Sequence, residues 1–212
     1  MKFKKITIFV LGLIILFIFF CFSYIVKKHF LTTFDFNTTV KLQGHDHVKF
    51  DKYFLFFSSL ANVEIISIFL LIFLIWRRKI LSGLAILFLF AFSHIVEIFG
   101  KVFINHPPPP FMFYRHPDVT AYTFQKYYVQ EGNSYPSGHS FRSVFLAALL
   151  IYVIWRSQKL SPGFKFILIC CIIGLASLIM LSKIIIGDHW ASDVIGGIIF
   201  GLSMGMFGII LL

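Results

Sequence analysis

Runs of apolar residues alternate with short polar segments along the whole chain, and each run has about the length of one membrane-spanning helix. An α-helix needs roughly 20 residues to cross a bilayer. On this basis we expect six spans, near residues 6–26, 53–76, 80–104, 137–155, 164–187 and 190–212. The pattern therefore predicts an all-α fold class, a polytopic membrane protein built as a bundle of six transmembrane helices.

The first apolar run has the position of a signal peptide but not its form. It is longer than a signal-peptide core, and Lys27, Lys28 and His29 stand where small residues would mark a cleavage site. We therefore expect a retained span. Residues 27–52 and 105–135 are the two substantial loops. The chain has no internal repeat and no low-complexity linker, so residues 1–212 are expected to form a single domain.

Composition supports the membrane class and argues against another. Only 13% of the residues are charged, about half the fraction usual in soluble domains, and 58% are hydrophobic. In a soluble protein the net charge of +10 would suggest a nucleic-acid partner. Here the basic residues gather at the ends of the apolar runs, as they do beside anionic head groups. Membrane lipids, and not nucleic acids, are the expected partners.

The distribution of charge also predicts an orientation. With the N-terminus inside, residues 1–5, 77–79 and 156–165 form the inner segments, which carry nine basic and no acidic residues. By the positive-inside rule, both termini are expected in the cytoplasm. The longer polar segments then face the extracytoplasmic side of a membrane that we expect to be a bacterial plasma membrane.

The first polar motif, residues 135–139, stands directly before the fourth span. Ser137 is a good N-cap for that span, and the backbone N–H groups of Ser137 and Gly138 then point toward an anion at the positive end of the helix. His139 lies in the first turn, where it can give a proton to a leaving oxygen, and Arg142 shares its helical face. The alternative is a simple turn that carries an incidental histidine.

The second polar motif, residues 182–193, joins the fifth and sixth spans. His189 and Asp193 are one helical turn apart, so the carboxylate can hold the Nδ1 proton of the imidazole and leave Nε2 as a nucleophile. Ser182 and Lys183, at the end of the fifth span, can bind phosphate oxygens. The alternative is a capped helix start with a histidine at the water boundary. Both motifs fall on one predicted side of the membrane, which favours the chemical interpretation.

A third polar stripe, formed by His94, Glu97 and Lys101, occupies one face of the third span. Ionisable residues inside a span are costly and indicate function by default. Lys101 lies at the outer end, level with both motifs, and is expected to bind phosphate. Glu97 is equally consistent with a structural ion pair to Lys101.

The two polar motifs resemble those of a known family. The Pro-Ser-Gly-His run of residues 136–139 and the Ser-Lys-x5-His-x3-Asp pattern of residues 182–193 resemble the second and third motifs of the type-2 phosphatidic acid phosphatase superfamily. The continuation to Gly197 is also similar, so the resemblance covers about residues 101–197. It implies a six-helix bundle with the motifs on one side, and hydrolysis that needs no metal or other cofactor.

The resemblance also implies a role for each residue. His189 is the implied nucleophile that forms a phosphohistidine, Asp193 orients it, and His139 protonates the leaving group. The residues implied to hold the phosphate oxygens are Lys101, Ser137, Gly138 and Lys183.

Two departures from the family pattern remove both expected arginines. The first family motif is Lys-x6-Arg-Pro, but Pro108 and Pro109 follow Lys101 at those places. The third motif usually starts Ser-Arg and here has Lys183. Arginine grips a phosphate with two parallel donors, whereas lysine acts as a point charge. Arg115 and Arg142 are the candidate replacements, and Arg142 is preferred because the helix fixes it relative to His139.

The sequence therefore predicts a membrane lipid phosphatase, a hydrolase that acts through a phosphohistidine on a phosphate or diphosphate lipid. The candidate substrates are a polyprenyl diphosphate, phosphatidate and phosphatidylglycerophosphate, entering sideways from the outer leaflet. One alternative is a phosphotransferase that passes the phosphate to a lipid or sugar acceptor. Another is a non-catalytic lipid-binding or transport relative, an alternative raised by the missing arginines.

No metal ligands are expected elsewhere in the chain. His45-Asp46-His47 in the first loop has a metal-ligand composition, but short histidine pairs in polar loops are commonly solvated. Nothing in the sequence indicates an oligomeric state.

Overall fold

The computed structural model describes residues 2–44, 48–78, 80–115 and 133–212. In these residues the chain forms eight α-helices and two short 3-10 helices, and no strand. The α-helices are α1 (Lys2–Lys27), α2 (Thr32–Gln43), α3 (Asp51–Ser59), α4 (Val63–Arg77), α5 (Ile80–Phe103), α7 (Gly138–Arg156), α8 (Pro162–Ile185) and α9 (Ala191–Leu211). The 3-10 helices are η1 (Val48–Phe50) and η2 (Phe111–Phe113). The predicted all-α fold class is confirmed.

The helices reproduce the predicted pattern of spans. Within the described ranges, α1, α5, α7, α8 and α9 are each long and apolar enough to cross a membrane. Together α3 and α4 make a sixth candidate, although they are bent by 49° at the break between them. The predicted bundle of membrane-spanning helices is therefore confirmed, with one span broken.

The broken span is the second one, which was expected as a single helix over residues 53–76. The chain leaves the helical path at residues 60–62, and α4 starts again after Asn62, whose ψ of 146° is extended. Asn62 does not cap α4 with its side chain, because its amide oxygen contacts His139 instead. The apolar pattern continues through Leu60 and Ala61, so it did not indicate this break.

Residues 27–52, expected as a loop, contain the helix α2. Asp35 and Thr39 on this helix are buried, with exposed fractions of 1% and 0%, and α2 packs against α8 and α9. Asp35 accepts hydrogen bonds from the backbone N–H and the hydroxyl of Ser192, each 2.7 Å long. The expectation was wrong because an acidic residue in a polar segment looks solvated in the sequence, whereas here a distant helix buries it.

The centre of the bundle is a close contact between α7 and α9. Gly197, Gly201 and Gly205 recur every fourth residue on the face of α9 that meets α7. A Cβ added at Gly201 would lie only 2.7 Å from the carbonyl oxygen of Phe141 and 2.9 Å from Cβ of Val144. Small residues at this spacing let two helix backbones approach closely inside a membrane. The contact brings together the first turns of α7 and α9, which carry the two polar motifs.

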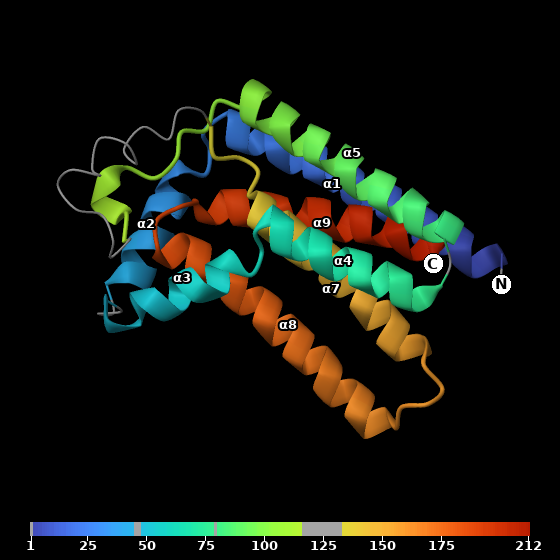
Figure 1. Cartoon of the computed structure of the whole chain (residues 1–212). Coiled ribbons are helices and arrows are strands. Elements are labelled where there is room, and N and C mark those ends of the chain that lie inside the picture. The colour runs from blue at the N-terminus through green and yellow to red at the C-terminus, as the bar shows by residue number, and fades with distance from the viewer. Residues whose placement is uncertain (1, 45–47, 79, 116–132) are drawn as a thin grey trace.

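The molecule has two distinct ends (Figure 1). Both termini lie at one end, where Lys5 Nζ donates a 2.7 Å hydrogen bond to the carbonyl oxygen of Ile210. The short helices α2 and α3 lie at the other end, beside the first turns of α7 and α9. All the elements that carry the polar motifs therefore meet at the end of the bundle away from the termini.

The glycine contact predicts a difference between two alanine substitutions. Gly201→Ala forces a methyl group against the α7 backbone, and overpacking of this kind costs about 1–3 kcal/mol of unfolding free energy. Gly174 on α8 has no heavy atom within 4 Å of an added Cβ, so Gly174→Ala is the matched control. It should leave stability unchanged or raise it by up to about 1 kcal/mol through helix propensity. Thermal unfolding in detergent measures both, and equal midpoints for the two variants would contradict the packing role.

Candidate active site

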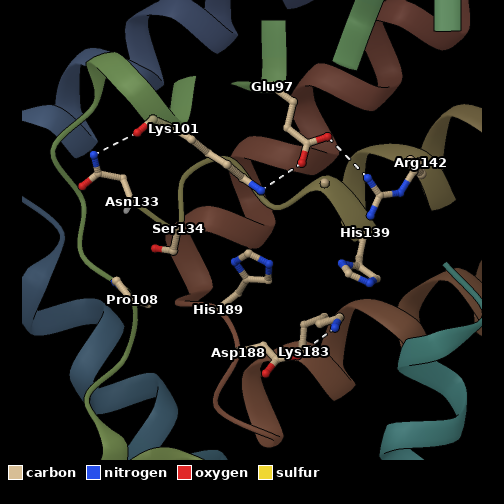
Figure 2. Close-up of a pocket in the computed structure, with 11 residues that line it drawn as sticks. Glu97, Lys101, Pro108, Asn133, Ser134, His139, Arg142, Lys183, Asp188 and His189 are labelled. Carbon is tan, nitrogen blue, oxygen red and sulfur yellow. Dashed lines mark hydrogen bonds and ion pairs between the residues drawn. The ribbon is translucent and has the colours of Figure 1, made fainter. Parts of the chain in front are cut away.

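A cavity of about 330 Å³ lies at the end of the bundle where the polar motifs meet (Figure 2). Its walls come from α5 and the segment that follows it, from α7 and the segment that precedes it, and from the end of α8 with the α8–α9 connection. The lining residues are Glu97, Lys101, Pro108, Asn133, Ser134, Gly138, His139, Arg142, Lys183, Asp188 and His189.

The first polar motif forms the start of α7, as expected. Ser137 is the N-cap, and its hydroxyl oxygen accepts hydrogen bonds from the backbone N–H and the hydroxyl of Ser140. The backbone N–H of Ser137 donates to the carbonyl oxygen of Asp193 at 3.0 Å, so it ties α7 to α9 and does not point into the cavity. Gly138 and His139 begin the helix, where backbone N–H groups have no acceptor inside the helix. Of the backbone amides predicted to face an anion, that of Gly138 therefore keeps a suitable position, at the start of the helix.

His139 is held by a residue that the sequence did not identify. Its Nε2 lies 3.0 Å from Oδ1 of Asn62, in the break between α3 and α4. The ring faces His189 across the cavity, with 6.4 Å between ring centroids. No sequence spacing connects Asn62 with His139, because the contact depends on the bend of the second span.

The second polar motif is a tight turn into α9. Gly187 has a φ of +79°, a conformation that favours glycine, and the backbone N–H groups of Asp188 and His189 both donate to the carbonyl oxygen of Lys183 at 3.1 Å. Asp193 Oδ2 accepts a 2.9 Å hydrogen bond from the backbone N–H of Trp190 and lies 3.4 Å from Nδ1 of His189. The predicted pairing of His189 with a carboxylate one turn later is present in the structure.

Asp193 has a second imidazole partner that the sequence analysis missed. His106 Nδ1 lies 2.9 Å from Oδ1 of Asp193, and His106 Nε2 lies 3.6 Å from Oδ2 of Asp35. These partners come from the segment after α5 and from α2, and no motif or spacing links them to Asp193. Asp193 is fully buried and His106 is 7% exposed.

The environment of His106 keeps its ring protonated near neutral pH. Burial by itself lowers the pKa of this imidazole, but the hydrogen bonds to Asp193 and Asp35 and the charges of the two carboxylates outweigh it. Together they raise the pKa of His106 from 6.5 to about 9.

Two cations on one side of the histidine pair share a carboxylate. Glu97 Oε1 lies 3.1 Å from Nζ of Lys101, and Glu97 Oε2 accepts a 3.4 Å hydrogen bond from Nη1 of Arg142. The Nε of Arg142 donates a 2.9 Å hydrogen bond to the carbonyl oxygen of Ala61. A Cβ at Gly138 would collide with the Glu97 carboxylate, so glycine makes room for this arrangement. The Glu97–Lys101 pair expected from the sequence is present, and Arg142 joins it.

The third cation lies on the other side of the histidine pair, as Figure 2 shows. Lys183 Nζ donates a 2.7 Å hydrogen bond to Oδ2 of Asp188. The two imidazoles therefore stand between a Lys101–Glu97–Arg142 cluster and a Lys183–Asp188 pair.

Some of the predicted phosphate-binding side chains do not reach the cavity. Arg115 Nη1 lies 3.8 Å from Oδ1 of Asp51 and its Nη2 donates to the carbonyl oxygen of Gln43, away from the histidines. The hydroxyl of Ser182 is fully buried and donates to the carbonyl oxygen of Ile179 at 2.7 Å. The structure brings together at the site His139, His189, Asp193, Lys101, Gly138, Lys183 and Arg142.

In the part of the chain that the structure describes, no group of three or more His, Cys, Asp or Glu side chains is arranged to hold a metal ion. His45-Asp46-His47 lies outside the described residues.

Comparison with known proteins gives the family. The family model described as the PAP2 superfamily matches residues 78–211, well over half of the chain, and the chain belongs to this superfamily. A lipid A 4'-phosphatase from Porphyromonas gingivalis is 27% identical over 177 residues, which cover 81% of this chain and 70% of the relative.

Two solved structures share the fold. The PAP2-type phosphatidylglycerolphosphate phosphatase of Bacillus subtilis superposes with a TM-score of 0.74 at 18% identity, covering 93% of each chain. LpxE of Aquifex aeolicus gives a TM-score of 0.60 at 18% identity, covering 82% of this chain and 94% of LpxE. Together with the family match, these findings confirm the predicted class, a membrane lipid phosphatase that acts as a hydrolase.

The raised pKa of His106 predicts how stability depends on pH. Below about pH 6.5 the ring is protonated in both folded and unfolded protein, and its stabilisation is complete; the stabilisation is lost as pH rises through about 9. A shift of this size corresponds to about 3 kcal/mol. The thermal unfolding midpoint of the wild type in detergent should therefore decrease as the pH is raised from about 6.5 to about 9. His106→Asn removes the titrating group and should flatten that slope, so parallel curves for the two proteins would contradict the prediction.

Proposed function

We propose that the protein hydrolyses phosphate monoesters of membrane lipids through a phosphohistidine on His189, without a metal ion. The observation that carries the proposal is the pair of imidazoles, His139 and His189, facing each other across a cavity with cations on both sides. Asp193 lies behind His189 and can accept a hydrogen bond from its Nδ1, which leaves Nε2 as the nucleophilic nitrogen.

The first step forms the phosphohistidine. Asp193 accepts from Nδ1 of His189, so Nε2 carries the lone pair that attacks phosphorus. As the Nε2–P bond forms, the bond from phosphorus to the lipid oxygen breaks, and His139 gives a proton to that oxygen. The lipid leaves as an alcohol.

The second step regenerates the enzyme. A water molecule attacks phosphorus and gives a proton to His139, which now acts as a base. The P–Nε2 bond breaks, inorganic phosphate leaves, and His189 recovers its lone pair.

Charge on the phosphoryl oxygens is the main quantity that the site must stabilise. We assign this role to Lys101, Lys183, Arg142 and the N-terminal amides of α7 beginning at Gly138. The buried position of Arg142, fixed by Ala61 and Glu97, supports it as the replacement for the missing motif arginines. Ser137 and Ser182 then contribute by holding the backbone of the two motifs in place through their hydrogen bonds.

The charge around the cavity supports a monoester substrate. Three cationic side chains line it, and two carboxylates, Glu97 and Asp188, already pair with them. The remaining formal charge is small, and a monoester brings less negative charge than a diphosphate. The relatives named above as phosphatases of lipid A and of phosphatidylglycerolphosphate support the same class.

We further propose the orientation that the basic segments favour. The cavity lies at the end of the bundle away from both termini, so cytoplasmic termini imply an extracytoplasmic site. A lipid substrate would reach it sideways from the outer leaflet, and the whole chain would act as one domain.

The catalytic histidines give the direct test. Phosphate release is measured in detergent with EDTA on phosphatidate, phosphatidylglycerophosphate, lipid A and polyprenyl diphosphate, and the wild type should favour the monoesters over the diphosphate. His139→Ala should lower kcat by about 10²–10⁴-fold, and His189→Ala should leave only the background rate. Activity in both variants equal to that of the wild type would eliminate the mechanism. Radiolabelled phosphate that appears on an acceptor lipid, and not as free phosphate, would indicate a phosphotransferase. Binding of the lipid phosphate without turnover would indicate a non-catalytic relative.

A second test distinguishes the two candidate arginines, Arg142 and Arg115. Removing one preorganised donor from a charged transition state costs about 10²–10³ in rate, so Arg142→Gln should lower kcat/KM by this factor. Arg115→Gln is the matched control, because its guanidinium binds Gln43 and approaches Asp51 outside the cavity. It should keep near wild-type kinetics. The assignment fails if Arg115→Gln shows the larger loss.

A further inference from the structure

We infer that His106 is a positioning residue for the nucleophile: its imidazole, fixed by Asp35, holds the Asp193 carboxylate in the orientation that supports His189. The inference rests on the proposed role of His189 in the reaction. It adds to the site two residues, one from the segment after α5 and one from α2, for which the family motifs specify no residue type.

The first argument is the geometry of the Asp193 carboxylate. This side chain is fully buried, so protein groups must supply the donors that water would otherwise provide. Oδ2 serves Trp190 N–H and His189 Nδ1, at 2.9 and 3.4 Å. Oδ1 faces His106 Nδ1 at 2.9 Å, the shorter of the two imidazole contacts. Because a carboxylate is planar, a fixed Oδ1 also fixes the direction of Oδ2.

The second argument is that His106 is itself held on several sides. Its backbone N–H donates to Asn133 Oδ1 at 2.8 Å, and its carbonyl oxygen accepts from the backbone N–H and the hydroxyl of Ser134 at 2.9 and 3.1 Å. The ring packs edge-on against Tyr135, with 6.4 Å between centroids. A residue so constrained can impose its orientation on a partner.

The third argument is a closed circuit of contacts around the start of α9. Asp35 approaches Nε2 of His106 at 3.6 Å and accepts two hydrogen bonds from Ser192, the residue before Asp193. This network links α2 to the nucleophile through side chains only a few ångströms apart. Its members are Asp35, His106, Asp193 and Ser192. Residues that orient a functional side chain in this way typically affect activity 10–100-fold in metal sites, where the effect is best measured, so roughly that scale is expected here.

The charge of His106 supports the Asp193 carboxylate in addition to orienting it. Among the described residues, the titratable groups that face His106 are Asp35 from α2, Asp193 from α9 and the Tyr135 side chain before α7, with His189 beyond Asp193. A cationic imidazole between two carboxylates favours an ionised Asp193 at this fully buried position. An ionised Asp193 is the form that accepts the Nδ1 proton of His189.

The test compares His106→Phe, which keeps the ring and removes the donor, with His106→Asn, which keeps a short donor. With a short-chain lipid monophosphate in detergent, His106→Phe should lower kcat about 10–100-fold with KM within about threefold. His106→Asn should recover most of the loss, since an amide N–H can replace the Nδ1 donor. Phosphohistidine trapped by rapid quench should form more slowly in His106→Phe by the same factor as kcat falls.

His94→Phe is the matched control. This histidine is partly buried among aromatic rings, on α5, but it bonds the carbonyl oxygen of Phe90 and packs on Phe141. Its replacement should leave kcat within about threefold. Asp35→Asn provides a second variant if His106→Phe does not fold; it should lower kcat and leave KM unchanged.

The outcomes separate this inference from the proposed function. Turnover that does not depend on His189 overturns both. If turnover depends on His189 but His106→Phe, or Asp35→Asn in its place, matches the His94→Phe control, the inference alone is overturned. A rise in KM with kcat unchanged also overturns it, because that result assigns His106 to binding.

Discussion

The close contact between α7 and α9 is the constraint on which the rest of the structure depends. Glycines on α9 let the two backbones approach until the backbone N–H of Ser137 reaches the carbonyl oxygen of Asp193. That single bond sets the separation between the two polar motifs, one at the start of each helix. The distance between His139 and His189, and the width of the cavity between them, follow from helix packing deep in the bundle.

A buried carboxylate inside a cavity proposed to bind phosphate is unexpected on charge alone. Glu97 lies between Lys101 and Arg142, so it spaces two cations that would otherwise repel each other in a low-dielectric region. The family motif provides an arginine from the segment after the third span. In this chain a guanidinium from α7 enters the same cavity, and a carboxylate from α5 holds it there. The proposed replacement of the motif arginine by Arg142 therefore involves Glu97 and a glycine, Gly138, that leaves room for the carboxylate.

The sequence predicted those features that depend on local pattern. Apolar runs of sufficient length located the spans, and the one-turn spacing of His189 and Asp193 predicted their contact. The features it did not predict depend on contacts between distant elements: Asp35 on α2, Asn62 at the bend, and His106 after α5. In the sequence, Asp35 and His106 look like ordinary loop residues, and Asn62 looks like an isolated polar residue inside a span. Only burial against a partner more than 70 positions away, as between Asn62 and His139, gives each of them a role.

The break in the second span has a consequence for how the site responds to its surroundings. A helix interrupted at membrane depth leaves backbone and side-chain acceptors without helical donors. Here two of those acceptors, the carbonyl of Ala61 and the amide of Asn62, are taken by Arg142 and His139. A regular helix through residues 60–62 would withdraw both at once. The angle between α3 and α4 is thus connected to two side chains of the cavity, so a change in this angle would displace His139 and the Arg142 guanidinium together.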